Sequence, residues 1–285
     1  MSLLSSINTN VGAQIALETL NATTSALNTT ENEVSTGYSV SNATDNGAAY
    51  AVAQNVRSDV SALTTANSAL GGVQGLLSTT LAGVNNISNT MASMRDVLVD
   101  LASASTTGTE RSQYEEQYNS LLANVKTFVQ DAGYNGTTLI GNISGSDGTY
   151  GSISVVRNEL GSTYGVASFS GSALYASLAF TSTQLASSTT VQGLITTTGT
   201  FLNQQNSVGT ELNSIGSSVD FINNQISYNS DKIDALNDGL GSLVDANMAQ
   251  ESSMLQSLQV KQELATSALT IAEQAPSVLL KLFSS

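Results

Sequence analysis

The sequence predicts a mainly α protein: a long, coiled-coil-like helical bundle built from both chain ends, with a small β-rich hairpin insertion. Three observations support this prediction. Pro276 is the only proline among 285 residues, so few breaks interrupt helical segments. Apolar residues recur every seven positions over two long stretches. Between these stretches the sequence becomes rich in Gly, Ser and Thr, which are typical of turns.

The first heptad pattern starts at Val56 and continues for about six repeats. One row comprises Leu63, Leu70, Leu77, Val84, Met91 and Leu98, and the second comprises Ala66, Val73, Ile87, Met94 and Leu101. Thr80 interrupts the second row. This spacing is typical of a helix whose apolar seam packs against other helices.

The second heptad pattern occupies the C-terminal half of the chain. Its rows comprise Leu194, Phe201, Val208, Ile215, Ile222 and Leu236, and Leu212, Val219, Ile226, Ile233 and Leu240. Asn229 interrupts it, and a buried Asn in such a seam more often fixes register or oligomeric state than binds a ligand. A shorter helix is predicted by Tyr114, Tyr118, Leu121, Val125 and Phe128. These helices can bury one another's stripes.

Residues 132–187 break the helical pattern. Gly133-Tyr134-Asn135-Gly136 and Gly145-Ser146-Asp147-Gly148 are turn signals, and the apolar run at 153–156 has strand character. We predict a small β-rich insertion at the tip of the bundle.

Both chain ends predict amphipathic helices, over residues 3–34 and 243–273. The first would be about 48 Å long, and such a stripe gains little stability until something covers it. Pairing of the two helices would leave much of both stripes bare, so we predict multimerisation through the termini. An intramolecular extension of the bundle is the alternative. The predicted contact residues are Ile7, Val11, Leu17, Leu20, Leu27, Val34, Met248, Leu255, Leu258, Leu269, Leu279, Leu282 and Phe283.

The composition argues against several functions. The chain has 8 basic and 22 acidic residues, a net charge of −14, and neither His nor Cys. We therefore expect no enzyme, metal site or cofactor of the usual His- or Cys-dependent kinds. The basic residues are scattered, which argues against nucleic-acid binding. We expect no membrane span, and no general secretory signal because no basic residue precedes Arg57.

Short motifs at the two ends are more specific. The N-terminal motifs are Ile7-Asn8-Thr9-Asn10, Ser35-Thr36-Gly37 and Asn46-Gly47-Ala48. The C-terminal ones lie in residues 243–252, 255–262 and 277–283. Together these motifs resemble the bacterial flagellins, especially the short flagellins of alphaproteobacteria. The resemblance covers roughly residues 1–131 and 188–285.

The resemblance implies a secreted structural subunit that passes through the flagellar type III channel. It would polymerise through its terminal helices into the extracellular filament used for motility. The implied partners are further copies of the chain, an export chaperone, the filament cap and hook-associated proteins. Residues 1–44 and 245–285 would supply the N- and C-terminal helices of an inner tube. Residues 45–131 and 188–244 would form the bundle domain, the latter as one long helix, with 132–187 as the outer insertion.

Three alternatives compete with this interpretation. The hook-filament junction protein shares terminal helices with flagellin, but Ile7-Asn8-Thr9-Asn10 near the start favours flagellin. A coiled-coil adhesin would lack the paired terminal motifs. Asp231, Asp234 and Asp238 could hold a cation in an enzyme, but they lack the glycine and closing Glu of a calcium loop. We interpret them as a solvated helix face.

Overall fold

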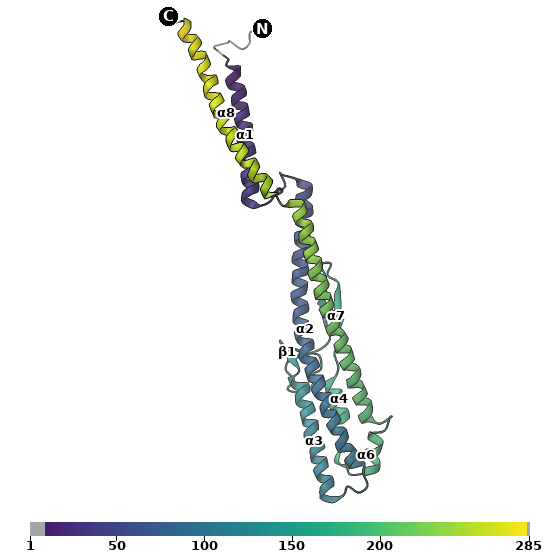
Figure 1. The fold of residues 1–285 in the computed structure, drawn as a ribbon. Coiled ribbons are helices and arrows are strands. Elements are labelled where there is room, and N and C mark those ends of the chain that lie inside the picture. The colour runs from purple at the N-terminus through teal and green to yellow at the C-terminus, as the bar shows by residue number, and fades with distance from the viewer. Residues whose placement is uncertain (1–8, 284–285) are drawn as a thin grey trace. The chain divides into compact units, whose positions relative to one another are not determined.

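The computed structural model describes residues 9–283, with side chains up to Gln274. Within this range the chain forms eight helices and five short strands (Figure 1). It divides into two compact units. The terminal unit combines the two chain ends, up to Ser58 and from Ala235 onward, and the central unit comprises residues 59–234. The predicted mainly α fold with helices at both ends and a small β insertion is confirmed.

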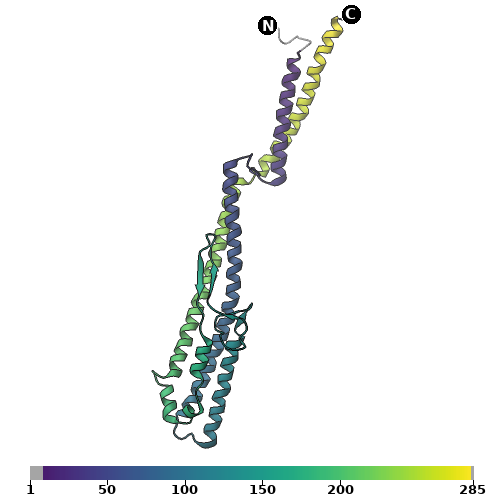
Figure 2. The same ribbon diagram turned by 180° about the vertical axis from the view of Figure 1, so that it is seen from behind.

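The terminal unit is built on a pair of helices from opposite ends of the chain. α1 (Val11–Thr36) and α8 (Met248–Phe283) lie side by side and run in opposite directions (Figures 1 and 2). Asn10 caps α1 by accepting a backbone N–H, and its side chain also donates to the carbonyl of Ala272 at 2.6 Å. Gly37 ends α1 with φ 77°, a left-handed conformation that glycine adopts without steric cost.

Short backbone pairing joins the segments beside these helices. Tyr38 and Asp245 form an antiparallel bridge, and the Ser39 amide donates to the carbonyl of Val244 at 2.8 Å. Val40, Ala53 and Val244 bury one another in a small apolar cluster. The segment after α1 is thereby fixed to the segment before α8.

The central unit contains the predicted heptad seams. α2 (Gly47–Ala102), α3 (Gly108–Asp131) and α7 (Thr200–Val244) share one hydrophobic core. All six members of the first heptad row, Leu63, Leu70, Leu77, Val84, Met91 and Leu98, are buried. Phe201, Val208, Ile215 and Ile222 are buried on α7. The period of seven therefore identified the core-facing sides of both long helices.

The buried face of α3 differs in part from the predicted stripe. Tyr118 and Val125 are buried as predicted, but Leu122 and Val129 complete the buried row. Leu121, Phe128 and Tyr114 flank this row and are half-buried. The Tyr118 hydroxyl donates to the carbonyl of Leu178 at 2.8 Å, and burial raises its pKa. The face is wide because α3 packs against both α2 and α4.

The strands occupy only the first part of the predicted insertion. They are β1 (Gly133–Tyr134), β2 (Thr137–Thr138), β3 (Thr149–Tyr150), β4 (Ile153–Val156) and β5 (Thr163–Val166). β1 and β2 form an antiparallel hairpin, and β3 pairs in parallel with β2. The Asn135-Gly136 turn has φ of 48° and 75°, as expected for an Asn-Gly hairpin. β4 and β5 form a separate antiparallel hairpin.

The sequence wrongly predicts β structure up to residue 187 and a long helix from residue 188. The segment instead forms three short helices, α4 (Gly171–Leu178), α5 (Ser182–Leu185) and α6 (Ser188–Leu194), before α7 starts at Thr200. Ser170, Thr181 and Ser187 each cap one of these helices by accepting a backbone N–H. Ser and Thr serve β-turns and helix caps alike, so composition did not distinguish the two.

The β4–β5 hairpin lies along the long helices of the central unit (Figure 2). Tyr164 stacks on Phe221 of α7 with ring centroids 4.0 Å apart, and its hydroxyl donates to Ser218 Oγ at 3.2 Å. Near the hairpin turn, Lys232 of α7 pairs with Glu159 at 2.6 Å. The predicted position at the tip of the bundle is wrong, because these contacts hold the hairpin against the side of α7.

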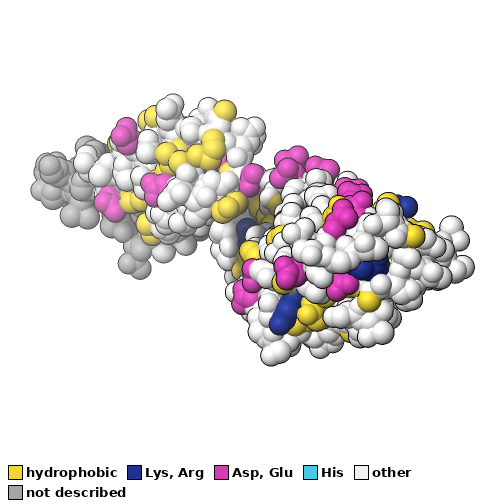
Figure 3. Space-filling model, turned by 90° about the horizontal axis from the view of Figure 1, so that it is seen from below, with side chains coloured by type: hydrophobic (Ala, Val, Ile, Leu, Met, Phe, Trp, Pro, Cys, Tyr) yellow, Lys and Arg dark blue, Asp and Glu magenta, His cyan; other side chains and the backbone are white. Residues whose placement is uncertain are grey.

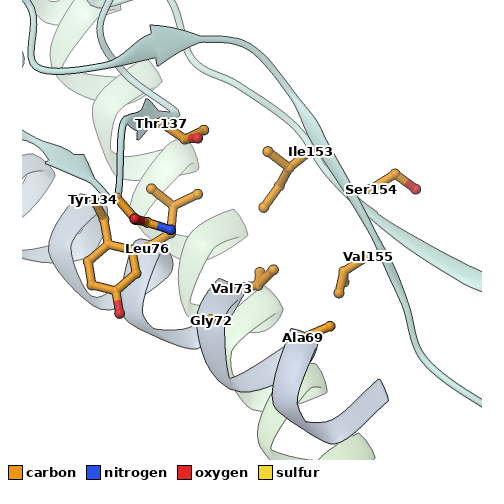
Figure 4. A pocket seen from close by; sticks show the side chains of 10 residues that line it. Ala69, Gly72, Val73, Leu76, Tyr134, Thr137, Ile153, Ser154 and Val155 are labelled. Atoms are coloured by element: carbon orange, nitrogen blue, oxygen red, sulfur yellow. The ribbon is translucent and has the colours of Figure 1, made fainter. Parts of the chain in front are cut away.

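Small residues on α2 make room for this hairpin. A groove of about 320 Å³ separates β4 from α2 and is lined by Ala69, Gly72 and Val73 on the helix. Figure 4 shows Ile153 and Val155 pointing toward α2, while Ser154 points away. The strand thus follows the alternation expected for a half-buried β-strand.

Asn229 connects three elements in the core. Its side-chain amide donates to Asn67 Oδ1 on α2 at 2.8 Å and to the carbonyl of Arg157, beside β4, at 3.0 Å. Its Oδ1 accepts from Gln225 at 2.8 Å, so the fully buried side chain is satisfied. These bonds fix the register of α7 against α2 and the hairpin.

We expect Asn229→Ala to lower the free energy of unfolding by about 1–3 kcal/mol, because it leaves two partly buried acceptors without a donor and removes a fully buried side chain. Urea denaturation followed by circular dichroism measures the loss. Asn223→Ala is the matched control, since the exposed Asn223 also links α7 to α2 by accepting from Gln74 at 2.6 Å. We expect the control to lose less than about 0.5 kcal/mol. Equal losses would contradict the special role of Asn229.

The position of α4 is testable at its first residue. A Cβ on Gly171 would lie 2.1 Å from the carbonyl oxygen of Ile140. We expect Gly171→Ala to cost about 1–3 kcal/mol of stability through overpacking. Gly71→Ala, in the interior of α2 with nothing within 4 Å of the added atom, should instead stabilise the protein by about 0.5–1 kcal/mol. Calorimetric melting of both variants checks the opposite signs.

Candidate polymerisation interface

α1 and α8 cover each other along one narrow stripe per helix. The buried members are Thr23, Leu27 and Thr30 on α1, and Leu258 and Ala265 on α8. Their spacing of three, four or seven residues places each set on one helix face. The two helices therefore pack along a continuous contact, but this contact buries only one narrow face of each helix.

The structure divides the predicted contact residues into groups. Leu27 and Leu258 are buried within the terminal unit. Leu17 and Met248 are exposed. The half-buried residues are Val11, Leu20, Val34, Leu255 and Leu269. Ile7 and the side chains of Leu279, Leu282 and Phe283 lie outside the described residues. Part of the predicted stripe is thus used inside the chain, and its contacts with other copies stay a prediction.

The sequence reasoning missed a second apolar stripe on α8. Val260, Leu264 and Ile271 are 56%, 63% and 72% exposed, and their spacing of four and seven residues places them on one face. This stripe follows the first at an offset of two residues, as Leu258 and Val260 illustrate. Two residues correspond to about 200° around a helix, so the second stripe faces away from α1. The repeat of apolar residues at this two-residue offset is the feature of the sequence that could have revealed the second stripe.

The exposed stripe has a physical consequence. Fully burying one Val, Leu or Ile side chain is worth about 1.5–3 kcal/mol. A helix with apolar residues on two opposite sides is typical of one that is covered on both. α1 adds further exposed apolar area through Ile15 and Leu17. The terminal unit therefore presents surfaces suited to association.

Within residues 9–283 no group of three acidic side chains is placed to hold a metal ion, and no helix is long and apolar enough to span a membrane. Asp231, Asp234 and Asp238 are each exposed, as expected for a solvated face. On the face shown in Figure 3, charged and hydrophobic side chains are scattered over a surface that otherwise consists of other side chains and backbone.

Comparison with known proteins decides the family. Residues 7–144 match the bacterial flagellin N-terminal helical region, and residues 195–283 match the bacterial flagellin C-terminal helical region. The chain belongs to the bacterial flagellin family. Flagellin FljO of Caulobacter vibrioides is 31% identical over 284 residues, covering 98% of this chain and 99% of that protein. A flagellin of Brucella melitensis is 30% identical over 297 residues, with coverage of 98% and 99%.

This flagellin is therefore a structural subunit of a bacterial flagellar filament. The two matched regions contain the whole of α1, α2, α3, α7 and α8, including both terminal helices. Residues 145–194, which hold β3 to α6, lie between them. The near-complete coverage favours flagellin over the junction protein and the adhesin.

Proposed function

We propose that this flagellin assembles into its filament by packing the outer stripe of α8 against the terminal helices of neighbouring copies. The observation that carries the proposal is the exposure of Val260, Leu264 and Ile271 after α1 has covered the opposite side of the same helix. In neighbouring copies, the exposed Ile15 and Leu17 supply apolar area on two different sides of α1, so each can serve a separate contact.

The geometry of this contact favours an open polymer. The stripe on α8 and the side chains on α1 are different surfaces of one subunit, so contact between them is heterologous. Heterologous contacts that do not close into a ring generate a helical filament. Each added subunit presents a fresh α8 stripe, and growth continues.

Because the three α8 side chains are already partly covered, burying their remaining exposed area would contribute about 3–6 kcal/mol per contact, before the cost of association is subtracted. The low charge of the chain supports extensive contact. Only 11% of residues are charged, and burying Ser, Thr or Asn with a hydrogen-bond partner costs less than burying Lys or Glu.

The remaining parts of the proposal follow the family. Residues 1–44 and 245–285 form the inner tube, 45–131 and 188–244 the surrounding shell, and 132–187 the outermost layer. The subunit reaches the cell exterior through the flagellar type III channel. An export chaperone, the filament cap and hook-associated proteins are its other partners. Its role is structural, without catalytic turnover.

We expect the triple variant Val260→Ser, Leu264→Ser, Ile271→Ser to raise the protein concentration needed for assembly by about 100-fold or more, since each 1.4 kcal/mol changes an equilibrium tenfold. Sedimentation and negative-stain microscopy of the full chain measure assembly. The fold of the central unit, followed by circular dichroism, should not change.

The matched control alters three exposed polar residues of the same helix: Gln256→Ser, Gln259→Ser and Thr266→Ser. These changes remove little apolar area, so the control should assemble like the unchanged protein. Normal assembly of the α8 stripe variant, or equal loss in the control, would rule out the stripe as the contact.

Removal of residues 1–34 or of 250–285 should abolish filaments and leave the central unit helical. Each deletion removes most of one terminal helix, whereas the heptad core lies in residues 59–234. Sedimentation shows whether polymer forms, and circular dichroism shows whether the core remains. Filaments built from either truncated chain would contradict assembly through the terminal unit.

A further inference from the structure

Two glutamates face each other in the terminal unit near the end of α1 and the start of α8, and Asp45 lies on the far side of one of them. Glu33 lies in the last turn of α1, Glu251 in the first turn of α8, and Asp45 in the loop before α2. Asp45 is well satisfied, because its Oδ2 accepts from the amides of Ser41 and Asn42 at 3.0 and 3.1 Å. These bonds lower its pKa, so it stays charged.

The two glutamates are less easily satisfied. Glu251 Oε2 is buried and has no hydrogen-bond partner. The antiparallel pairing of α1 and α8 places Glu33 opposite Glu251, because Gln262 donates to Thr24 on one side of them and Tyr38 pairs with Asp245 on the other. The carboxyl of Glu33 interacts there with that of Glu251. Two ionised carboxylates offer only acceptors, so neither can satisfy the other. A proton on one of them supplies the missing donor.

The surroundings place that proton on Glu33. The first turn of α8 favours the negative charge of Glu251, whereas the last turn of α1 disfavours a negative charge on Glu33. Burial, followed by the contact and charge of Glu251 and the charge of Asp45, raises the pKa of Glu33. No ion pair among the described residues involves Glu33, so no basic side chain offsets its charge in that way. The guanidinium of Arg57 on α2 lies over the Tyr38 ring instead, with its carbon 5.7 Å from the ring centroid.

We propose that Glu33 and Glu251 share a proton that fastens the end of α1 to the start of α8, so that the closure of the terminal unit responds to pH. The pair lies within one chain and close to the Tyr38–Asp245 bridge. It does not depend on contacts with other copies, so it stands apart from the assembly proposal.

The direction of the pH response follows from the raised pKa of Glu33. The stabilisation is fully present below the ordinary pKa of a glutamate and is lost as the pH rises through the raised value of the folded state. Above that value two negative charges face each other, with Asp45 adding a third. The closure is therefore firmer in mildly acid than in mildly alkaline solution.

Carboxyl NMR of the full-length chain, labelled with ¹³C at its glutamate side chains, tests the proposal. The signal that disappears in Glu33→Gln identifies Glu33, and the signal that disappears in Glu31→Gln identifies an exposed glutamate of the same helix. We expect Glu33 to titrate at a higher pH than Glu31. Glu251→Gln should move the Glu33 midpoint down toward that of Glu31, and Glu31→Gln should leave it in place.

Amide hydrogen exchange of α1, corrected for the intrinsic exchange rate, provides a second readout and shows that α1 is folded in each variant. Protection near Glu33 should fall between mildly acid and mildly alkaline solution in the unchanged protein and in Glu31→Gln. In Glu33→Gln this protection should be independent of pH, because the side-chain amide of the glutamine donates a hydrogen bond to Glu251 and does not titrate. Any of three results would overturn the proposal. The titration midpoint of Glu33 could equal that of Glu31, or Glu251→Gln could leave the Glu33 midpoint unchanged. The pH response of amide protection could also persist in Glu33→Gln.

Discussion

The need to cover apolar stripes on long helices is the constraint on which this flagellin depends. In the central unit, α3 and α7 cover the α2 seam from within the chain, so Leu70, Leu77 and Met91 are fully buried. In the terminal unit, α1 covers only one of the two stripes of α8, and the stripe of Val260 and Ile271 stays open. The same interaction thus completes one unit internally and leaves the other suited to self-association.

The sequence revealed the long helices because their signal is local and periodic. A repeat of seven extends over many turns, so single interruptions such as Thr80 do not hide it; the Thr80 hydroxyl bonds to the carbonyl of Leu76 within α2. The position of the hairpin depends instead on contacts distant in sequence. Tyr164 meets Phe221, and Arg157 meets Asn229, and no local pattern records either contact. The sequence therefore predicts the hairpin but not its position.

The candidate interface was predictable only in part for a related reason. Periodicity identifies an apolar face, but it does not say whether the cover comes from the same chain or another. Leu27 and Leu258 satisfied the pattern and are buried inside the terminal unit. The Val260 stripe was harder to detect because two stripes on opposite sides of a helix offset each other in a search for one apolar face. Only the position of α1 distinguishes them.

The cover that α1 gives to α8 also limits where charge can lie. A carboxylate on a covered face must find a donor or lose its charge, since burying an unpaired ion is costly. Glu251 lies in the first turn of α8, where the helix terminus favours its charge, and Glu33 is the neighbour able to supply a donor. A proton shared by the two glutamates gives the buried Oε2 of Glu251 a donor without the help of a basic residue. Basic residues are scarce, since the chain has only 8 Lys and Arg. The scarcity of Lys and Arg thereby makes the closure of the terminal unit depend on a proton where an ion pair would otherwise serve.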